Sequence, residues 1–137
     1  MGTEENTPPL LDYGFNEVEC QIVRSLQDLQ QMINQVQIDR GWIKRNEDGE
    51  FEGPSFDRLI NLMHSEISES VEADRTGAMD KHLPDVEGRF AEFADVVIRA
   101  FGTAAIYKQD LATIVMRKHR YNMTRKDHDP KTRAKQY

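Results

Sequence analysis

Cysteine is almost absent from this 137-residue chain, and Cys20 is its only example. A lone cysteine excludes an internal disulfide and a thiolate metal cluster. Long apolar runs are missing as well, since no stretch approaches the roughly 18 residues that cross a bilayer. The first ten residues, MGTEENTPPL, lack the basic and apolar parts of a signal peptide. We therefore expect a cytoplasmic protein.

A surplus of positive charge is absent too. The chain has 24 acidic and 18 basic residues, for a formal net charge of -6. This balance argues against a protein that wraps a nucleic acid polymer, because such proteins present a basic surface. The sign reverses from Met116 onward, where MRKHRYNMTRKDHDPKTRAKQY is rich in Lys and Arg. Positive charge is thus concentrated at one end of the sequence.

Alternating strand patterns are not found, whereas apolar residues recur at helical steps of three and four. The first such segment follows Asn16, a candidate N-cap, and stops near Gly41. After a turn-rich stretch, Ser55 is placed to cap a second helix that reaches about Arg75. Two long helices are therefore predicted in the first half of the chain.

Two further helices are predicted in the second half. The one over residues 86–107 is apolar around most of its circumference, so we expect neighbouring helices to enclose it. The last runs from Asp110, another candidate N-cap, to about Arg125. We predict an all-α four-helix bundle with the second and third helices at its centre. The helical domain would span 16–126, between a flexible N-terminal arm (1–15) and a flexible C-terminal tail (127–137).

Two pairs of acidic residues stand out on the second and third predicted helices. Glu66 and Glu69 are three residues apart, and Glu92 and Asp95 repeat that spacing. Residues so spaced leave the same face of a helix. Glu66 also falls within an apolar stripe, where an unpaired carboxylate costs several kcal/mol to bury. We expect the pairs to converge if the two helices pack antiparallel.

Converging carboxylates repel one another unless cations neutralise them. Oxygen ligands without Cys or a well-placed His favour Mg²⁺ or Mn²⁺ over zinc, and Mg²⁺ commonly binds substrate phosphates as well. The alternative is plain: acidic pairs are common on solvated helix faces, and Asp95 with Arg99 has the spacing of an ordinary salt bridge.

A basic triplet follows on the fourth predicted helix. Lys118, Asn122 and Arg125 fall at i, i+4 and i+7, and their side chains are suitable donors for a polyphosphate. Alternatively, Lys and Arg in a last turn complement the helix dipole. Trp42, the only tryptophan, is placed to stack on a base or to cover a bundle end. Asn46 is a further candidate for nucleotide contact, or a builder of the Asn-Glu-Asp-Gly turn.

Taken together, these motifs resemble the all-α nucleoside triphosphate pyrophosphohydrolase superfamily, and specifically short, phage-type MazG-like proteins. The family pattern of ExxE followed by ExxD matches Glu66-Ile67-Ser68-Glu69 and Glu92-Phe93-Ala94-Asp95. Its later element, a Lys, an Asn and an Arg at the same spacing, matches Lys118, Asn122 and Arg125. The LMHSEISESVEA segment and the run over residues 41–50 resemble the short members too. Coverage extends over about 16–126.

The resemblance implies Mg²⁺-dependent hydrolysis between the α- and β-phosphates of a nucleotide, giving a monophosphate and pyrophosphate. The four matched carboxylates would hold the metal, and the basic triplet would grip phosphates. One of the four carboxylates would orient the attacking water, and we choose Glu69 for this role because it lies at the edge of the apolar stripe. The resemblance also implies a homodimer or homotetramer, and a location in the host cytoplasm if the chain is phage-encoded.

Several substrates and rival functions remain open at this stage. Within the superfamily these are dGTP hydrolysis to dGMP, removal of dUTP or dCTP, and hydrolysis of phosphoribosyl-ATP. Outside it, the fold could serve as a non-catalytic helical interaction module. A di-iron carboxylate bundle is disfavoured, because no Glu of the two central helices has His three residues later.

Overall fold

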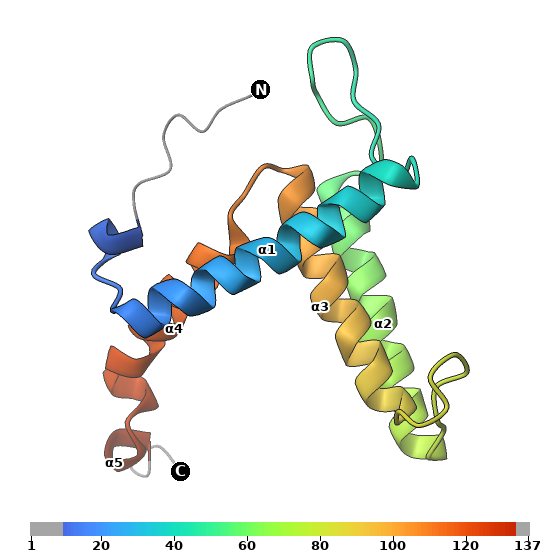
Figure 1. The fold of residues 1–137 in the computed structure, drawn as a ribbon. Helices are drawn as coiled ribbons and strands as arrows, with labels where there is room; N and C mark the ends of the chain where they lie inside the picture. The colour runs from blue at the N-terminus through green and yellow to red at the C-terminus, as the bar shows by residue number, and fades with distance from the viewer. Residues whose placement is uncertain (1–9, 134–137) are drawn as a thin grey trace. The chain divides into compact units, whose positions relative to one another are not determined.

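The computed structural model describes residues 10–133 and is built from helices (Figure 1). The described residues contain no strand, only isolated bridges between Arg45 and Phe51 and between Met79 and Glu87. The predicted all-α class with four main helices is therefore confirmed. In chain order the helices are η1 (Leu10–Tyr13), α1 (Glu17–Asp39), α2 (Phe56–Thr76), α3 (Gly88–Ile106), α4 (Leu111–Thr124), η2 (Lys126–His128) and α5 (Pro130–Arg133).

Contacts along the chain divide it into two compact units, which are described separately below. Unit 1 combines residues 1–29 with 110–137, and unit 2 is the continuous stretch 30–109. Helix α1 contributes its first half to unit 1 and its second half to unit 2. No helix of the described residues has the length and apolar character needed to cross a membrane.

In unit 1, hydrogen-bonding side chains set where the helices begin. The backbone N–H of Glu19 donates to Oδ1 of Asn16 at 2.8 Å, and Oε1 of Glu19 accepts from the N–H of Asn16 at 3.0 Å. This reciprocal capping box fixes the start of α1 as the sequence predicts. At the start of α4, Asp110 accepts from the N–H of Thr113 at 3.1 Å and from Nε2 of Gln27 at 2.8 Å.

Unit 1 is closed by a small apolar core and one arginine. Phe15, Cys20, Ala112 and Met116 are buried in it, so Cys20 is a small core residue. Arg120 of α4 donates to the carbonyl of Gly14 at 2.6 Å, which ties the segment before α1 to α4. The region predicted to be a flexible tail contains two short helical segments, η2 and α5, while 134–137 lie outside the described residues.

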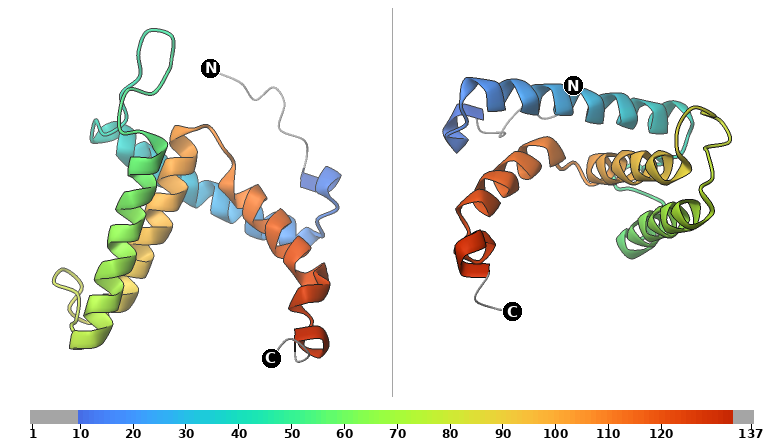
Figure 2. Two further views of the ribbon diagram at one scale, coloured as in Figure 1. Left: turned by 180° about the vertical axis from the view of Figure 1, so that it is seen from behind. Right: turned by 90° about the horizontal axis from the view of Figure 1, so that it is seen from below.

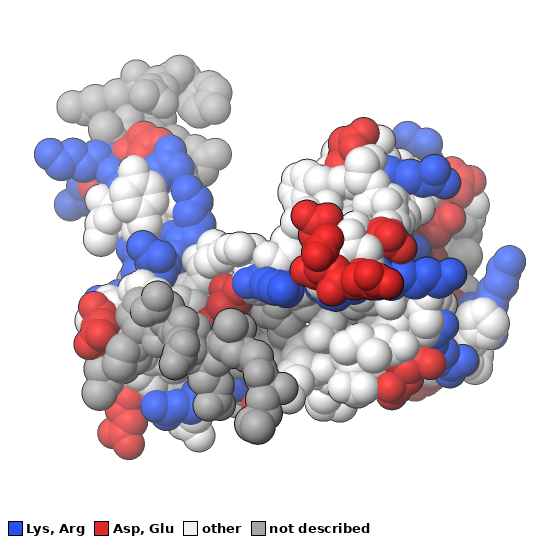
Figure 3. Space-filling view, turned by 90° about the horizontal axis from the view of Figure 1, so that it is seen from above, with Lys and Arg blue, Asp and Glu red and all other residues white. Residues whose placement is uncertain are grey.

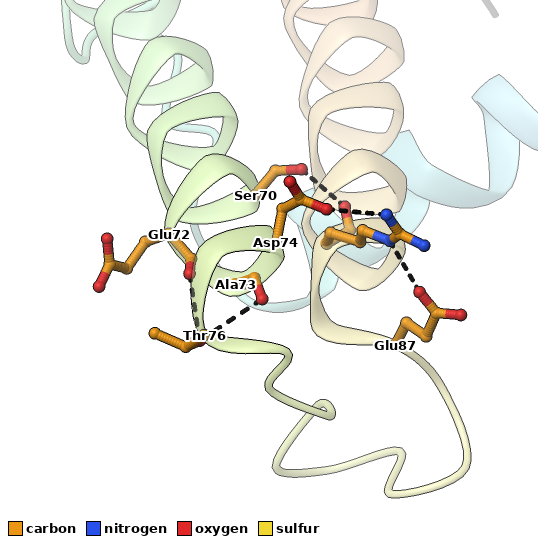
Figure 4. Close-up of polar contacts among 7 residues, drawn as sticks. Ser70, Glu72, Ala73, Asp74, Thr76 and Glu87 are labelled. Carbon is orange, nitrogen blue, oxygen red and sulfur yellow. Dashed lines mark hydrogen bonds and ion pairs between the residues drawn. The ribbon is translucent and has the colours of Figure 1, made fainter.

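In unit 2, α2 and α3 pack side by side along their lengths (Figure 2), and they run antiparallel, which is the condition given above for the acidic pairs to converge. Ser70 of α2 is buried and donates through Oγ to the carbonyl of Arg89 at 2.8 Å. The Arg89 side chain pairs with Asp74 and with Glu87, each at 2.7 Å (Figure 4). The second half of α1 joins α3 through Gln37, whose Nε2 donates to the carbonyl of Gly102 at 3.2 Å.

The connection between α2 and α3 is tied at its base. Gly77 ends α2 in the left-handed conformation, with φ of 65°. The N–H of Gly88 then donates to the carbonyl of Ala78 at 2.8 Å, and the N–H of Asp80 to that of Val86 at 2.9 Å. A Cβ at position 88 would lie 2.8 Å from the Ala78 oxygen, so glycine is required for this close approach.

The prediction that neighbours enclose the third helix is wrong for the described chain. The side chains of Phe90, Phe93 and Val97 on α3 are 54%, 57% and 48% exposed. The physical reason is that α2 and α1 together cover only part of the helix circumference. A helix that is apolar nearly all round therefore keeps one apolar side uncovered within unit 2.

Candidate functional site

Three of the four predicted carboxylates meet between α2 and α3. Carboxylate oxygens of Glu66, Glu69 and Glu92 lie within 4.8 Å of one another. The i, i+3 spacing brings the first two onto one side of α2, and antiparallel packing brings α3 alongside at the same level. Three hard oxygen donors from two rigid helices suit a cation such as Mg²⁺ or Mn²⁺ chemically, although acidic groups also gather on surfaces without one.

Glu66 is the most buried member of this acidic trio. Its side chain is only 12% exposed, and Nε of Arg99 on α3 lies 2.6 Å from its Oε1. Arg99 thus pairs across the helices with Glu66, and not along its own helix with Asp95 as a simple i, i+4 salt bridge would. The nearly buried carboxylate is therefore neutralised by the guanidinium group of Arg99, which the sequence places on the same polar strip of α3 as Glu92 and Asp95.

The close carboxylates change one another's proton affinity. Burial, a hydrogen bond to Glu66 and the negative charge of Glu69 raise the pKa of Glu92 to about 7. Burial and the charge of Glu66 raise the pKa of Asp95 above its ordinary value. For Glu66, burial raises the pKa, but the hydrogen bond and charge of Arg99, together with hydrogen bonds from Glu92 and Glu69, outweigh burial and lower the pKa. At neutral pH the trio holds a proton part of the time.

Asp95, the fourth predicted ligand, lies next to the trio but is not part of it. It lines a cavity of about 470 Å³ together with all three glutamates. The connection between α2 and α3 supplies Asp80, Lys81 and His82 to the same cavity. Glu72 also lines it, although its carboxyl group points away from α3 (Figure 4). The cavity therefore brings acidic side chains from two helices together with basic side chains from one loop.

A second cavity, of about 480 Å³, begins at Glu66 and Asp95 and is otherwise more apolar. Trp42 lines it, with its side chain 66% exposed, opposite Ile98 of α3. The residues that line it are Ile33, Val36, Gln37, Trp42, Glu66, Asp95, Ile98 and Arg99. An apolar cavity with a few polar groups at one end is the usual form of a small-molecule site. The sequence analysis identified Trp42 but not the aliphatic side chains of this cavity. These come from two helices, α1 and α3, and spacing along the chain does not show that they meet.

Asn46 does not line either of these cavities. Its Oδ1 accepts from the backbone N–H groups of Asp48 and Glu50, at 3.0 and 2.9 Å. Its Nδ2 donates to the Glu50 side chain at 3.0 Å. Of the two roles considered for Asn46, the described contacts match the building of its turn.

The basic triplet belongs to unit 1, whereas the carboxylates belong to unit 2. Basic side chains gather over α4 (Figure 3). Lys118 and Asn122 are in α4, and Lys118 Nζ lies 5.2 Å from the centre of the Tyr121 ring. Arg125 follows the last residue of α4 in an extended conformation and pairs with Asp127. Oδ1 of Asn122 is buried and accepts no hydrogen bond from any described residue.

A comparison of the chain with protein-family models, curated proteins and solved structures found no match. The described chain is an all-α protein with four main helices, in which an acidic trio adjoins an apolar cavity.

Proposed function

We propose that this protein is a Mg²⁺- or Mn²⁺-dependent nucleoside triphosphate pyrophosphohydrolase that releases a nucleoside monophosphate and pyrophosphate. The observation that carries the proposal is the convergence of Glu66, Glu69 and Glu92, because Glu66 also lines the cavity that contains Trp42. This arrangement offers a place for metal-bound phosphates beside a place for a planar base. The order of motifs along the chain, ExxE, ExxD and the basic triplet, supports the same reading.

In this mechanism Glu66, Glu69, Glu92 and Asp95 would hold the cation. Bound there, the metal would polarise the attacked phosphorus and acidify a water, effects that together supply several kcal/mol. Glu69 is exposed, unlike Glu66, and is therefore the carboxylate we assign to orienting the attacking water. The raised pKa of Glu92 suits a group that exchanges a proton for a cation near neutral pH.

The nucleotide would lie along unit 2 with its base against Trp42 and the aliphatic wall of Ile33, Val36 and Ile98. Stacking on Trp42 would supply affinity with little discrimination among bases. The amide of Gln37 is the polar group of this cavity suited to reading a base edge. We propose that Lys118, Asn122 and Arg125 contact the phosphates, as donors suited to that role.

A panel assay tests the reaction. Purified protein is incubated with Mg²⁺ or Mn²⁺ and each ribo- and deoxyribonucleoside triphosphate separately, and the products are separated by chromatography. Monophosphate with pyrophosphate is expected, and the preferred substrate would distinguish dGTP from dUTP or dCTP. Release of diphosphate and orthophosphate would contradict the proposed bond cleavage.

A matched pair of variants ties the reaction to the acidic trio. Glu69→Gln is expected to lower kcat about a hundredfold or more, because a positioned proton acceptor contributes about that much. Glu47→Gln makes the same change of charge on an exposed loop residue and should leave kcat unaltered. Equal activity in both variants would remove Glu69 from the chemistry.

The second candidate is a non-catalytic helical interaction module. The many large apolar side chains left exposed on α1, α2 and α3 are the observation that favours it. Intact nucleotides with every divalent metal would support this reading over the enzymatic one.

A further inference from the structure

Two cavities of unit 2 adjoin each other at a pair of carboxylates. Glu66 and Asp95 line both the cavity of Trp42 and the cavity beside the acidic trio. The Trp42 cavity extends from them to Ile98 of α3, whereas the other cavity extends to the α2–α3 connection, at the end of the helix pair (Figure 1). We call this second one the loop-side cavity. The site is therefore more apolar on one side of the shared carboxylates and charged on the other.

The loop-side cavity is rich in negative charge. Its basic side chains are Lys81 and His82. A polyphosphate would bring further negative charge to this cavity, and repulsion between like charges would oppose its binding. A cation on the acidic trio offsets part of that repulsion, and a basic side chain on the other side of the phosphates offsets more. The carboxyl groups that line the cavity belong to Glu66, Glu69, Glu72, Asp80, Glu92 and Asp95.

Hydrogen bonds hold the α2–α3 connection in a turn beside this cavity. Oδ2 of Asp80 accepts from the backbone N–H groups of Leu83 and His82, at 2.7 and 2.8 Å. The N–H of Asp80 donates to the carbonyl of Val86 at 2.9 Å. Lys81 lies inside this turn, between Asp80 and His82. The turn therefore fixes the backbone from which Lys81 reaches the cavity.

The charge of this turn acts on the predicted metal ligands. Burial raises the pKa of Asp95, and the negative charges of Glu66 and then of Asp80 raise it further. Lys81 follows Asp80 directly, yet it forms no ion pair with any residue that the structure describes. A lysine that lines an acidic cavity without pairing keeps its ammonium group available for a ligand. Such a group binds phosphate as a compact point charge.

We propose that Lys81 binds the β- and γ-phosphates of the substrate, which become the pyrophosphate product. The nucleotide then lies with its base in the Trp42 cavity, its α-phosphate at Glu66 and Asp95, and its outer phosphates in the loop-side cavity. This inference rests on the proposed function and adds a substrate-binding residue outside the motifs of the sequence. Unlike the basic triplet, Lys81 belongs to the same unit as the carboxylates. The bond to be cleaved lies where the two cavities meet.

Isothermal titration calorimetry with inorganic pyrophosphate and Mg²⁺ tests the role of Lys81 without turnover. Lys81→Gln is expected to bind pyrophosphate about tenfold more weakly than the wild type, because a charge-assisted contact is lost. Lys44→Gln makes the same change of charge at an exposed residue that lines neither cavity, and it should bind like the wild type. Equal affinities in the two variants, or a wild type that does not bind pyrophosphate, would overturn the inference.

Product inhibition tests the direction in which the nucleotide lies. Lys81→Gln should raise the inhibition constant of pyrophosphate about tenfold and leave that of the nucleoside monophosphate unchanged. Trp42→Ala should do the reverse, because base stacking is lost while the outer phosphates keep their contacts. A Lys81→Gln variant that loses affinity for the monophosphate and not for pyrophosphate would place the nucleotide in the opposite direction and reject the inference.

Turnover separates failure of this inference from failure of the proposed function. Normal hydrolysis with unchanged pyrophosphate affinity in Lys81→Gln would contradict the inference alone. Absence of hydrolysis for every triphosphate would contradict the proposed function. In that case the calorimetry with pyrophosphate still decides whether Lys81 binds phosphate.

Discussion

Arg99 on α3 neutralises Glu66 on α2, with 2.6 Å between its Nε and the Oε1 of the carboxylate. Glu66 is nearly buried while Arg99 remains 40% exposed, so solvent screens part of the attraction. Arg99→Gln is therefore expected to lower the free energy of unfolding by about 1 kcal/mol at neutral pH. Urea denaturation of the two proteins measures this difference.

The same pair predicts a pH dependence. Because the folded protein holds the pKa of Glu66 below its unfolded value of 4.5, the pair stabilises the fold above that pH and loses its effect as pH falls. The difference between wild type and Arg99→Gln should shrink in acid. Arg75→Gln, at an exposed position, serves as the control and should change stability little at any pH.

Glu92 predicts the opposite trend. Its folded pKa of about 7 lies above the ordinary 4.5, so the folded state binds more protons than the unfolded state between these values. Stability should therefore fall as pH rises from 4.5 to 7. Glu92→Gln cannot lose that proton and should exceed wild-type stability by about 1–2 kcal/mol above pH 7, with no gain below 4.5. Urea midpoints across this pH range check the sign, and a wild type that gains stability on the same rise would contradict it.

Metal binding should stabilise the folded protein if the acidic trio holds a cation. Mn²⁺ is expected to raise the Tm of the wild-type protein in proportion to the logarithm of its concentration. Glu66→Gln should lose this rise and Mg²⁺-dependent turnover while keeping its helical circular dichroism. Glu47→Gln carries the same charge change away from the trio and should respond like wild type. An unchanged Mn²⁺ response in Glu66→Gln would place the metal elsewhere.

Trp42 reports on the cavity that it lines, because it is the only tryptophan in the chain. Its fluorescence should change when a nucleotide binds, without interference from another indole. Trp42→Ala is expected to raise KM about tenfold with a smaller effect on kcat, since base stacking contributes about 1–3 kcal/mol. Phe56→Ala removes an exposed ring that contacts Tyr107 outside the cavity, and its KM should match wild type.

Lys118 tests the basic triplet. If its ammonium group binds a phosphate, Lys118→Gln should raise KM about tenfold and weaken the dependence of KM on salt. The neighbouring Arg117 stacks on Tyr13, 4.8 Å from the ring centre, so Arg117→Gln provides a variant of equal charge change. Similar KM values in these two variants would show that the substrate responds to the net positive charge of α4 and not to a specific contact with Lys118.

Local signals explain why the helices could be predicted. Asn16 and Asp110 form the hydrogen bonds that begin α1 and α4, and Gly77 ends α2 in the conformation glycine favours. These interactions involve residues close in sequence, so spacing alone reveals them. The same holds for the convergence of Glu66 with Glu69, which depends only on helical periodicity.

Features that depend on packing between elements were less predictable. The partner of Glu66 could not be read from spacing, because Arg99 has Asp95 at an equally suitable position on its own helix. The exposure of Phe93 was missed because an apolar circumference does not tell how many neighbours surround it. Arg125 left the expected helical face because α4 ends one residue earlier, at Thr124.

The hydrogen bond from the Gly88 N–H to the Ala78 carbonyl closes the α2–α3 connection at its base. The alignment of the two helices therefore does not depend on the length of the loop beyond this bond. Because the loop is closed at its base, a change in its length is expected to leave the alignment of the two acidic pairs unchanged, while it would move Lys81 and His82, which line the cavity beside them. A side chain at position 88, in contrast, would meet the Ala78 carbonyl and disturb this closure.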